Sequence, residues 1–297
     1  MISLDLLGKI MALSCAMLWG LAIVFFKRSG DTIPPTVLNL YKTTITAILF
    51  LPILALTDPL SSGDMLATKD IAILSISGIL GIALADSLVF KCLNLLGAGL
   101  FGIVDCLYSP ILIALSCVLL TTPLHPMEIV GTLMVVFAVL VATLGVGDSG
   151  DSPPQMLLGV LIGALGMVLM AFSIILMKPI LEYASVWWVT GIRLLASAFV
   201  LVAMVASKGQ FQQFLSVLKS KETLKYALPG TILGNFLAMT IWIAGFKYTD
   251  VHSAAILNQT STIFIVIFAS ILLKEPFNTR RTIATLLAFS GAVVVII

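Results

Sequence analysis

A carboxylate inside an apolar stretch is the residue of this chain whose chemistry most needs explaining. Asp105 lies in the stretch Ala98–Leu120 and begins the short polar run DCLYS at residues 105–109. At the helical rise of 1.5 Å per residue it lies about 10 Å into that stretch, too deep for its short side chain to reach water easily. A carboxylate there suits proton coupling or the binding of an ammonium group. The structural alternative is a buried hydrogen-bond network or an ion pair, for example with Lys42.

A second polar run occurs at the equivalent place later in the chain. Residues 258–262 read NQTST and lie inside the apolar stretch Val251–Leu273. Contact with lipid explains poorly why two equivalent stretches turn polar at the same depth, whereas one shared central cavity explains it well. Residues three and four apart lie on one face of a helix. The residues expected to face this cavity are Asp105, Tyr108, Asn258 and Thr262, with Gln259 beside them.

Two basic residues also occupy equivalent positions, each about two turns into an apolar stretch. They are Lys42 in Pro34–Leu56 and Arg193 in Val186–Ser207. The functional interpretation is a cationic clamp for a carboxylate or a phosphate. The structural one is that both side chains reach up to lipid headgroups or bind backbone carbonyls where the two halves meet.

Asp86 and Trp19 complete the set of candidate site residues. Asp86 lies near the end of the stretch Ile71–Lys91, and a wet interface shared with Lys91 explains its charge equally well. Trp19 lies deeper in its stretch, Gly8–Phe26, than a tryptophan of an interfacial belt usually does. A cavity wall and an interfacial position both remain open for it.

An internal repeat explains why these residues come in pairs. Lys27 and Lys178 are 151 residues apart, as are Lys42 and Arg193. Further along the offset is 153, which relates Gly81 to Gly234, Asp105 to Asn258 and Pro123 to Pro276. A change of two residues between the registers corresponds to one loop insertion. We therefore divide the chain into two units, residues 1–147 and 156–297.

Composition places both units in a membrane. The chain is 60% hydrophobic and 10% charged, whereas soluble domains carry about a quarter charged residues. Apolar runs of about 20 residues recur, which is the length needed to cross a bilayer as a helix. The continuous runs exclude the short alternating strands of a membrane barrel. The ten expected spans are Gly8–Phe26, Pro34–Leu56, Ile71–Lys91, Ala98–Leu120, Met127–Leu144, Leu157–Met177, Val186–Ser207, Tyr226–Lys247, Val251–Leu273 and Thr279–Ile297.

Five spans in each unit is an odd number, so the second unit enters the membrane from the opposite face. Inverted repeats of this kind are typical of secondary transporters, whose substrate site lies near mid-bilayer between the repeats. The stretch between Ser207 and Tyr226 has apolar residues at helical spacing and predicts a short interfacial helix. The expected fold class is therefore an all-α integral membrane protein built from two inverted five-helix repeats.

Other chemistries find little support in the sequence. The four cysteines lie in apolar stretches without metal-ligand spacing, and neither histidine belongs to an HExxH pattern. No GxxxxGK[ST] and no Gly-x-Ser-x-Gly motif is present. We expect no enzymatic activity, no metal, no cofactor and no nucleic-acid partner. The expected partners are a small molecule and the lipid bilayer, with the chain as a monomer or a dimer.

These features together resemble the drug/metabolite transporter superfamily, specifically its EamA-type members. The resemblance covers nearly the whole chain and rests on the repeat together with several short motifs in order. They are Trp19-Gly20, the basic residues Lys42 and Arg193, Pro110, Lys274-Glu275-Pro276, and the glycines Gly131 and Gly291. The first unit departs from the family pattern, because Thr122-Pro123 lacks the glutamate and each unit keeps one of two glycines.

The resemblance implies a ten-helix carrier with a central cavity and has exporters of amino acids or other metabolites among its relatives. It also implies cytoplasmic termini, whereas the distribution of lysine and arginine over the loops favours the reverse orientation. The favoured function is a secondary transporter, an exporter or exchanger of a small polar metabolite in a prokaryotic plasma (inner) membrane. The alternatives are an integral-membrane enzyme, a channel-like facilitator and a membrane receptor or scaffold.

Overall fold

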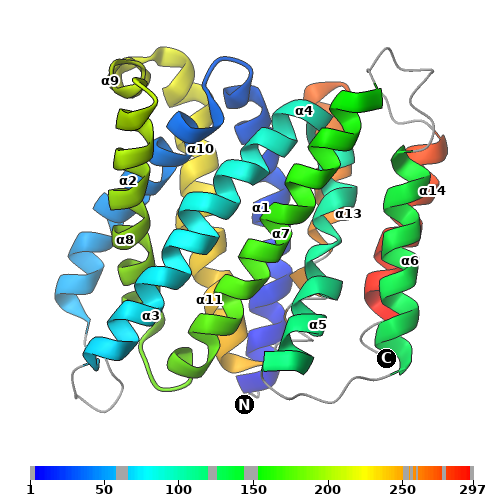
Figure 1. Ribbon diagram of the computed structural model, residues 1–297, viewed down its shortest axis with the longest axis horizontal. Helices are drawn as coiled ribbons and strands as arrows, with labels where there is room; N and C mark the ends of the chain where they lie inside the picture. Colours follow the sequence, from blue (N-terminus) through cyan, green and yellow to red (C-terminus); the bar gives the residue numbers. More distant parts are fainter. Residues whose placement is uncertain are drawn as a thin grey trace.

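The chain folds into a bundle of helices in a computed structural model (Figure 1). The structure describes residues 4–57, 66–119, 126–143, 153–249, 254, 257–258, 260–275 and 279–294, and no β-strand occurs among them. The helices of the first half are α1 (Leu4–Gly30), α2 (Pro35–Leu56), α3 (Thr68–Gly78), the π-helix η1 (Ile79–Ala85), α4 (Asp86–Asp105), α5 (Tyr108–Leu119) and α6 (Pro126–Thr143).

The second half follows a similar order, with some elements divided into shorter segments and with one additional helix. Its helices are α7 (Pro153–Leu181), α8 (Val186–Ser207), α9 (Phe211–Lys219), η3 (Thr223–Ala227), α10 (Leu228–Gly230), η4 (Thr231–Ala238), α11 (Met239–Tyr248), α13 (Ser261–Phe268), η5 (Ala269–Leu273) and α14 (Thr279–Val294). The addition is α9, which is the short helix that the sequence predicts between Ser207 and Tyr226. It buries Phe214 and Val217 and leaves Phe211 exposed.

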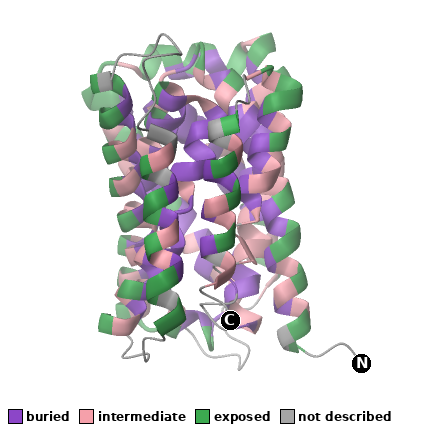
Figure 2. Cartoon of the chain, turned by 90° about the vertical axis from the view of Figure 1, so that its right-hand side faces the viewer, coloured by how far each residue is buried: buried purple, intermediate pink, exposed green. Residues whose placement is uncertain are grey.

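The outside of the bundle is apolar, as an integral multi-pass membrane protein requires. Among the described residues, six helices are long and apolar enough to cross a membrane, and shorter apolar helices accompany them. Large hydrophobic side chains such as Phe199 and Leu161 are exposed at 80% and 58%. Exposed residues lie on the outside and buried residues in the interior (Figure 2). Lipid accounts for this exposed apolar surface, because the bilayer interior solvates such side chains better than water does.

The third and fourth expected spans are joined by a kink instead of a loop. Helical structure continues from Thr68 to Asp105, and the chain turns back at Gly97, whose φ of 76° and ψ of 171° suit a residue without a side chain (Figure 1). The carboxylate of Glu275 accepts hydrogen bonds from the backbone N–H groups of Ala98 and Gly99, both at 2.8 Å. These groups lie directly after the kink, where a helix begins and its first N–H groups lack partners within the helix. The Glu-Pro motif of the second repeat thus caps a helix of the first.

The fourth and ninth expected spans are both interrupted at the same place. Residues 106–107 form a turn between α4 and α5, and Thr260 forms a turn before α13. Leu107 and Thr260 are equivalent at the 153-residue offset. In the first repeat Pro110 explains the break, because proline lacks an N–H and its ring clashes with the carbonyl four residues earlier. In the second repeat the hydroxyl of Thr260 donates to the carbonyl of Leu257 at 2.7 Å instead.

Each repeat also contains a π-helix at an equivalent position. The elements η1 and η4 occupy equivalent positions at the 153-residue offset. A π-helix leaves some carbonyls poorly paired and is common at functional sites. The Asn39 amide donates to two such carbonyls of η1, those of Ile82 at 2.7 Å and Ala83 at 3.2 Å. The two π-helices therefore lie in the interior of the bundle, where the internal cavity is found.

Candidate functional site

An internal cavity of about 80 Å³ lies between the two repeats. This is room for several water molecules, and it is smaller than the roughly 300–1,000 Å³ pockets that hold drug-sized ligands. The walls come from α1, η1, α4, α5, α7, α8, η4 and α11 and from residue 258. The polar side chains and tryptophans of the lining are Asp86, Asp105, Tyr108, Arg193, Asn235, Asn258, Trp19 and Trp242.

The lining follows the internal repeat. At the 153-residue offset, Ile82, Asp86 and Val89 of the first unit are equivalent to Asn235, Met239 and Trp242 of the second unit, in that order. The two walls therefore come from equivalent positions but differ in chemistry. A cavity built on equivalent positions with unequal side chains can offer different groups to the two ends of one ligand.

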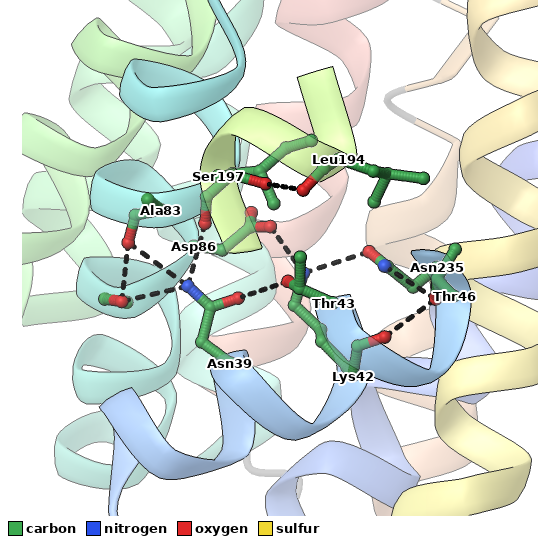
Figure 3. A network of polar contacts seen from close by, with 11 residues as sticks. Asn39, Lys42, Thr43, Thr46, Ala83, Asp86, Leu194, Ser197 and Asn235 are labelled. Carbon is green, nitrogen blue, oxygen red and sulfur yellow. Dashed lines mark hydrogen bonds and ion pairs between the residues drawn. The ribbon is translucent and has the colours of Figure 1, made fainter. Parts of the chain in front are cut away.

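Lys42 is held by an acid inside the bundle. Its Nζ donates to Asp86 Oδ2 at 2.6 Å and to Asn235 Oδ1 at 2.9 Å, and it lies 5.6 Å from the centre of the Phe90 ring. Asn235 in turn donates to Thr46 Oγ1 at 2.9 Å, which closes the network shown in Figure 3. Lys42 is 1% exposed and Asp86 6%. A buried pair of this kind is stable only while both members remain, because removal of one leaves an unpaired charge.

This pair corrects three interpretations of the sequence. Lys42 does not reach toward headgroups, because its side chain runs inward between α2, α4 and η4. Its partner is Asp86 and not Asp105. Asp86 does not lie at a wet interface with Lys91. Its carboxylate is the acid that neutralises Lys42, a long-range contact that spacing along one helix could not predict.

Arg193 occupies the equivalent position of the second repeat but has different partners. It is 1% exposed, so it too does not reach the membrane surface. Its Nη2 donates to Ser173 Oγ at 2.8 Å and its Nη1 approaches the sulfur of Met177 at 3.0 Å. The Nε atom is buried without a hydrogen-bond partner, and no carboxylate contacts the guanidinium within the described part of the chain. Gly81 leaves room for it, since a Cβ there would lie 3.2 Å from Nη2.

Asp105 and two aromatic residues face the same cavity. Among the described residues, no hydrogen bond or ion pair links the Asp105 carboxylate to another side chain. Among the described residues, the Tyr108 hydroxyl and the Trp242 Nε1 are buried without hydrogen-bond partners, and their rings lie 6.1 Å apart, centre to centre. The wall thus combines an acid without an ion-pair partner, a guanidinium that is only partly paired and two unpaired neutral donors within the described part of the chain. Buried polar groups are usually paired, so such a cluster indicates a ligand site.

Of the other predicted site residues, Asn258 and Trp19 line the cavity and Thr262 does not. Asn258 lines the cavity and accepts a hydrogen bond of 3.5 Å from Cys15, and Trp19 is part of the wall. Thr262 is buried outside the lining, where it donates to the carbonyl of Gly102 at 3.1 Å and contacts Cys106. It joins the two repeats and does not face the cavity with Asn258. Gln259 lies outside the described residues.

Sequence reasoning missed several residues of the lining. Asn235 and Met239 were not singled out, although the 153-residue offset relates them to Ile82 and Asp86. Asn235 is the only asparagine of its span, so a search for lone polar residues in apolar stretches would have found it. The methionines Met167 and Met170 carry no such signal, because their type is ordinary in an apolar helix. Within the described ranges, no three His, Cys, Asp or Glu side chains form a group that could hold a metal ion.

Comparisons with known proteins agree with this architecture. The model of the EamA-like transporter family matches the chain twice, over residues 6–144 and 157–297. A solved structure, titled only as the crystal structure of a protein, is similar with a TM-score of 0.68 and 18% identity. The match covers 97% of this chain and 95% of the other, and at this identity it shows the fold alone. No curated protein matches the chain.

The two family matches leave out only residues 1–5 and the segment 145–156 between the repeats. Members of this family are membrane transporters of the drug/metabolite transporter superfamily and not enzymes. The apolar exterior, the paired π-helices and the interrupted helices beside one cavity are in keeping with that role. This chain belongs to the EamA-like transporter family.

Proposed function

We propose that the chain is a secondary active transporter that exports or exchanges a small polar metabolite, such as an amino acid, across a prokaryotic plasma (inner) membrane. The observation that supports this most directly is the pair of interrupted helices beside the cavity. The turns at Leu107 and Thr260 are equivalent in the two repeats, and Asp105 and Asn258 lie two residues before them. Interrupted helices at a repeat interface form the substrate sites of many secondary transporters.

Alternating access is the mechanism that this arrangement favours. In the proposal, the two units are five-helix repeats of opposite orientation that rock against each other around the cavity. The hydrogen bonds from Ala98 and Gly99 to Glu275 join the units at one end of the bundle. The cavity of about 80 Å³ suits a small cargo, and its walls must separate before a larger molecule enters. A contact that breaks and re-forms at one end is what such a cycle requires.

Coupling to protons is assigned to Asp105 in this proposal. It lines the cavity with no ion-pair partner in the described chain, whereas Asp86 is committed to Lys42. Its equivalent, Asn258, cannot titrate. A titratable carboxylate without an ion-pair partner at the substrate site lets protonation and substrate binding influence each other, which is the basis of coupled transport. No cofactor is needed for this chemistry.

The test is transport by the purified protein in sealed vesicles. We expect one or more members of an amino-acid and metabolite panel to raise the unfolding temperature, because specific binding stabilises the folded state. The same compounds should show saturable exchange when vesicles are loaded with unlabelled compound and labelled compound is added outside. Uptake that rises linearly without saturation would instead indicate a channel-like facilitator. Chemical conversion of the compound would indicate an enzyme.

A further inference from the structure

We infer that Arg193, Tyr108 and Trp242 form an anion subsite that binds the carboxylate of a dipolar substrate, whose ammonium group lies toward Asp105. The inference rests on the proposed transport function and specifies the chemistry of its cargo. All four side chains line one cavity of about 80 Å³. A small α-amino acid carries both required charged groups on one carbon atom, Cα.

The first argument is the incomplete pairing of Arg193. A guanidinium has five N–H donors. Only Nη2 has a hydroxyl partner, Nη1 contacts the weakly accepting sulfur of Met177, and Nε has none within the described chain. Asp86 lies near enough to attract the guanidinium, but its carboxylate contacts Lys42 and not Arg193. Among the described residues the buried Arg193 therefore has no directly bound counter-ion, which is costly. Its planar donors match a carboxylate, with which arginine forms short, charge-assisted and often bidentate hydrogen bonds.

The repeat shows what Arg193 lacks. Its equivalent, Lys42, contacts Asp86, whose own equivalent in the second unit is Met239. The second unit therefore keeps the cation and replaces the acid with an apolar side chain that also lines the cavity. An anion supplied by the substrate takes the role that Asp86 has in the first unit. The cation of the first unit does not serve as a second anion site, because Asp86 and Asn235 already bind it.

Two neutral donors complete the subsite. The Tyr108 hydroxyl and the Trp242 indole N–H are buried, have no hydrogen-bond partner among the residues that the structure describes, and belong to neighbouring rings with centres 6.1 Å apart. Both can donate to an anion, and the indole nitrogen can only donate. Burial of such donors without any partner would cost about 1–3 kcal/mol each. A carboxylate oxygen satisfies either of them.

Charge balance decides between a simple anion and a dipolar molecule. Asp86 and Lys42 neutralise each other, which leaves Arg193 and Asp105 as opposite charges that do not contact each other. A simple anion would satisfy Arg193 and add repulsion to Asp105, whereas a zwitterion satisfies both. The charges that line the cavity are therefore complementary to those of a molecule with a carboxylate and an ammonium group.

The experiment uses matched probes of known chemistry on the full-length protein. The probes are the free amino acids alanine, valine, methionine and phenylalanine, their primary amides, which lack the carboxylate, and their N-acetyl derivatives, which lack the ammonium group. Binding is measured as the shift in unfolding temperature and transport as exchange in vesicles. The variants are Arg193→Met, Asp105→Asn and, as a minimal change, Tyr108→Phe. Replacement of a buried arginine by methionine keeps the volume, and folding is checked by size-exclusion chromatography.

In the wild-type protein at least one free amino acid should bind at least about tenfold more tightly than its amide. Arg193→Met should abolish this preference for the acid, and Tyr108→Phe should reduce it about fivefold. Asp105→Asn should instead abolish the preference over the N-acetyl derivative. Each variant thus reports on one end of the substrate.

Three results would overturn the inference. An Arg193→Met variant that keeps the wild-type ratio of acid to amide binding would show that the carboxylate is bound elsewhere. If the protein exchanges other metabolites, such as sugars or phosphate esters, and does not respond to amino acids, the proposal of a dipolar substrate is wrong but the proposed transport function is not. If the well-folded wild-type protein exchanges no compound of the whole metabolite panel, the proposed transport function is wrong, and so is the inference that rests on it.

Discussion

Lys42 in α2 and Arg193 in α8 occupy equivalent positions of the two repeats, yet their surroundings differ. Lys42 contacts an acid, an amide and an aromatic face, all supplied by the protein. Arg193 contacts a serine and a methionine, and its Nε has no hydrogen-bond partner among the described residues. Duplication explains why a buried cation occurs twice. In our proposal, one copy of this cation forms a structural ion pair and the other binds a ligand.

The largest expected effect comes from breaking the structural pair. Lys42→Met leaves the Asp86 carboxylate buried and unpaired, which should lower the free energy of unfolding by about 3–5 kcal/mol. The matched change Arg193→Met should have little effect on stability or should raise it, because Arg193 has no acid to strand. Thermal unfolding of both variants in detergent measures the difference.

The double variant Lys42→Met/Asp86→Leu is the control for this prediction. Without either charge no unpaired ion remains at the site of this pair, so most of the lost stability should return. If Arg193→Met is as destabilising as Lys42→Met, the contrast between the two repeats is wrong.

The next effect concerns transport. Asp105→Asn makes the first interrupted helix resemble the second, in which Asn258 stands at the equivalent position. We expect uphill, pH-driven accumulation to be lost while passive exchange of substrate partly survives, because the variant cannot titrate. Stability should stay close to that of the wild type, since Asp105 has no ion-pair partner among the described residues. Vesicles with and without an imposed pH gradient provide the measurement. Normal uphill transport by the variant would leave Asp105 with a structural role only.

A third change converts the second repeat toward the first. Met239→Asp introduces an acid at the position equivalent to Asp86, in the wall of the cavity that Arg193 also lines. The new carboxylate should compete with the substrate for the guanidinium and weaken binding of the free amino acid at least about tenfold. Met239→Leu keeps the wall apolar and serves as the control. An equal loss of amino-acid binding in both variants would show that the shape of the side chain at position 239, and not its charge, determines binding.

The smallest expected effect lies at the junction between the repeats. Glu275→Gln keeps one acceptor for the N–H groups of Ala98 and Gly99 but removes the charge that favours a helix N-terminus. We expect a loss of about 1 kcal/mol in stability and an altered rate of exchange, because this contact joins the units. Glu222→Gln removes a charge from the helical residue directly before η3 and should change neither quantity. An effect of equal size from Glu222→Gln would contradict the capping role.

Much of the architecture follows from local properties of the sequence. Runs of apolar residues determine helices and their membrane environment, and the constant offset between Lys42 and Arg193 reveals the duplication. Pro110 marks one interrupted helix, since proline lacks the backbone N–H that would continue the hydrogen bonding of a helix. Asp105 stood out because an acid in an apolar stretch is costly without a function or a partner. These features depend on residue type and spacing alone, so they can be read without a structure.

The partners of the buried charges depend on tertiary structure. Lys42 and Asp86 are 44 residues apart, and Asn235 reaches the same amine from the other repeat, 193 residues away. No helical periodicity relates such positions. Packing of α2 against α4 and η4 brings Lys42 to Asp86 and Asn235. Contact between α13 and α4 brings Thr262 to Gly102, and the arrangement of α4 and α8 places Asp105 and Arg193 at one cavity. Sequence thus determined which polar residues enter the membrane, because their cost is local, whereas the fold decided which are paired, because electrostatic contacts depend on distance in space.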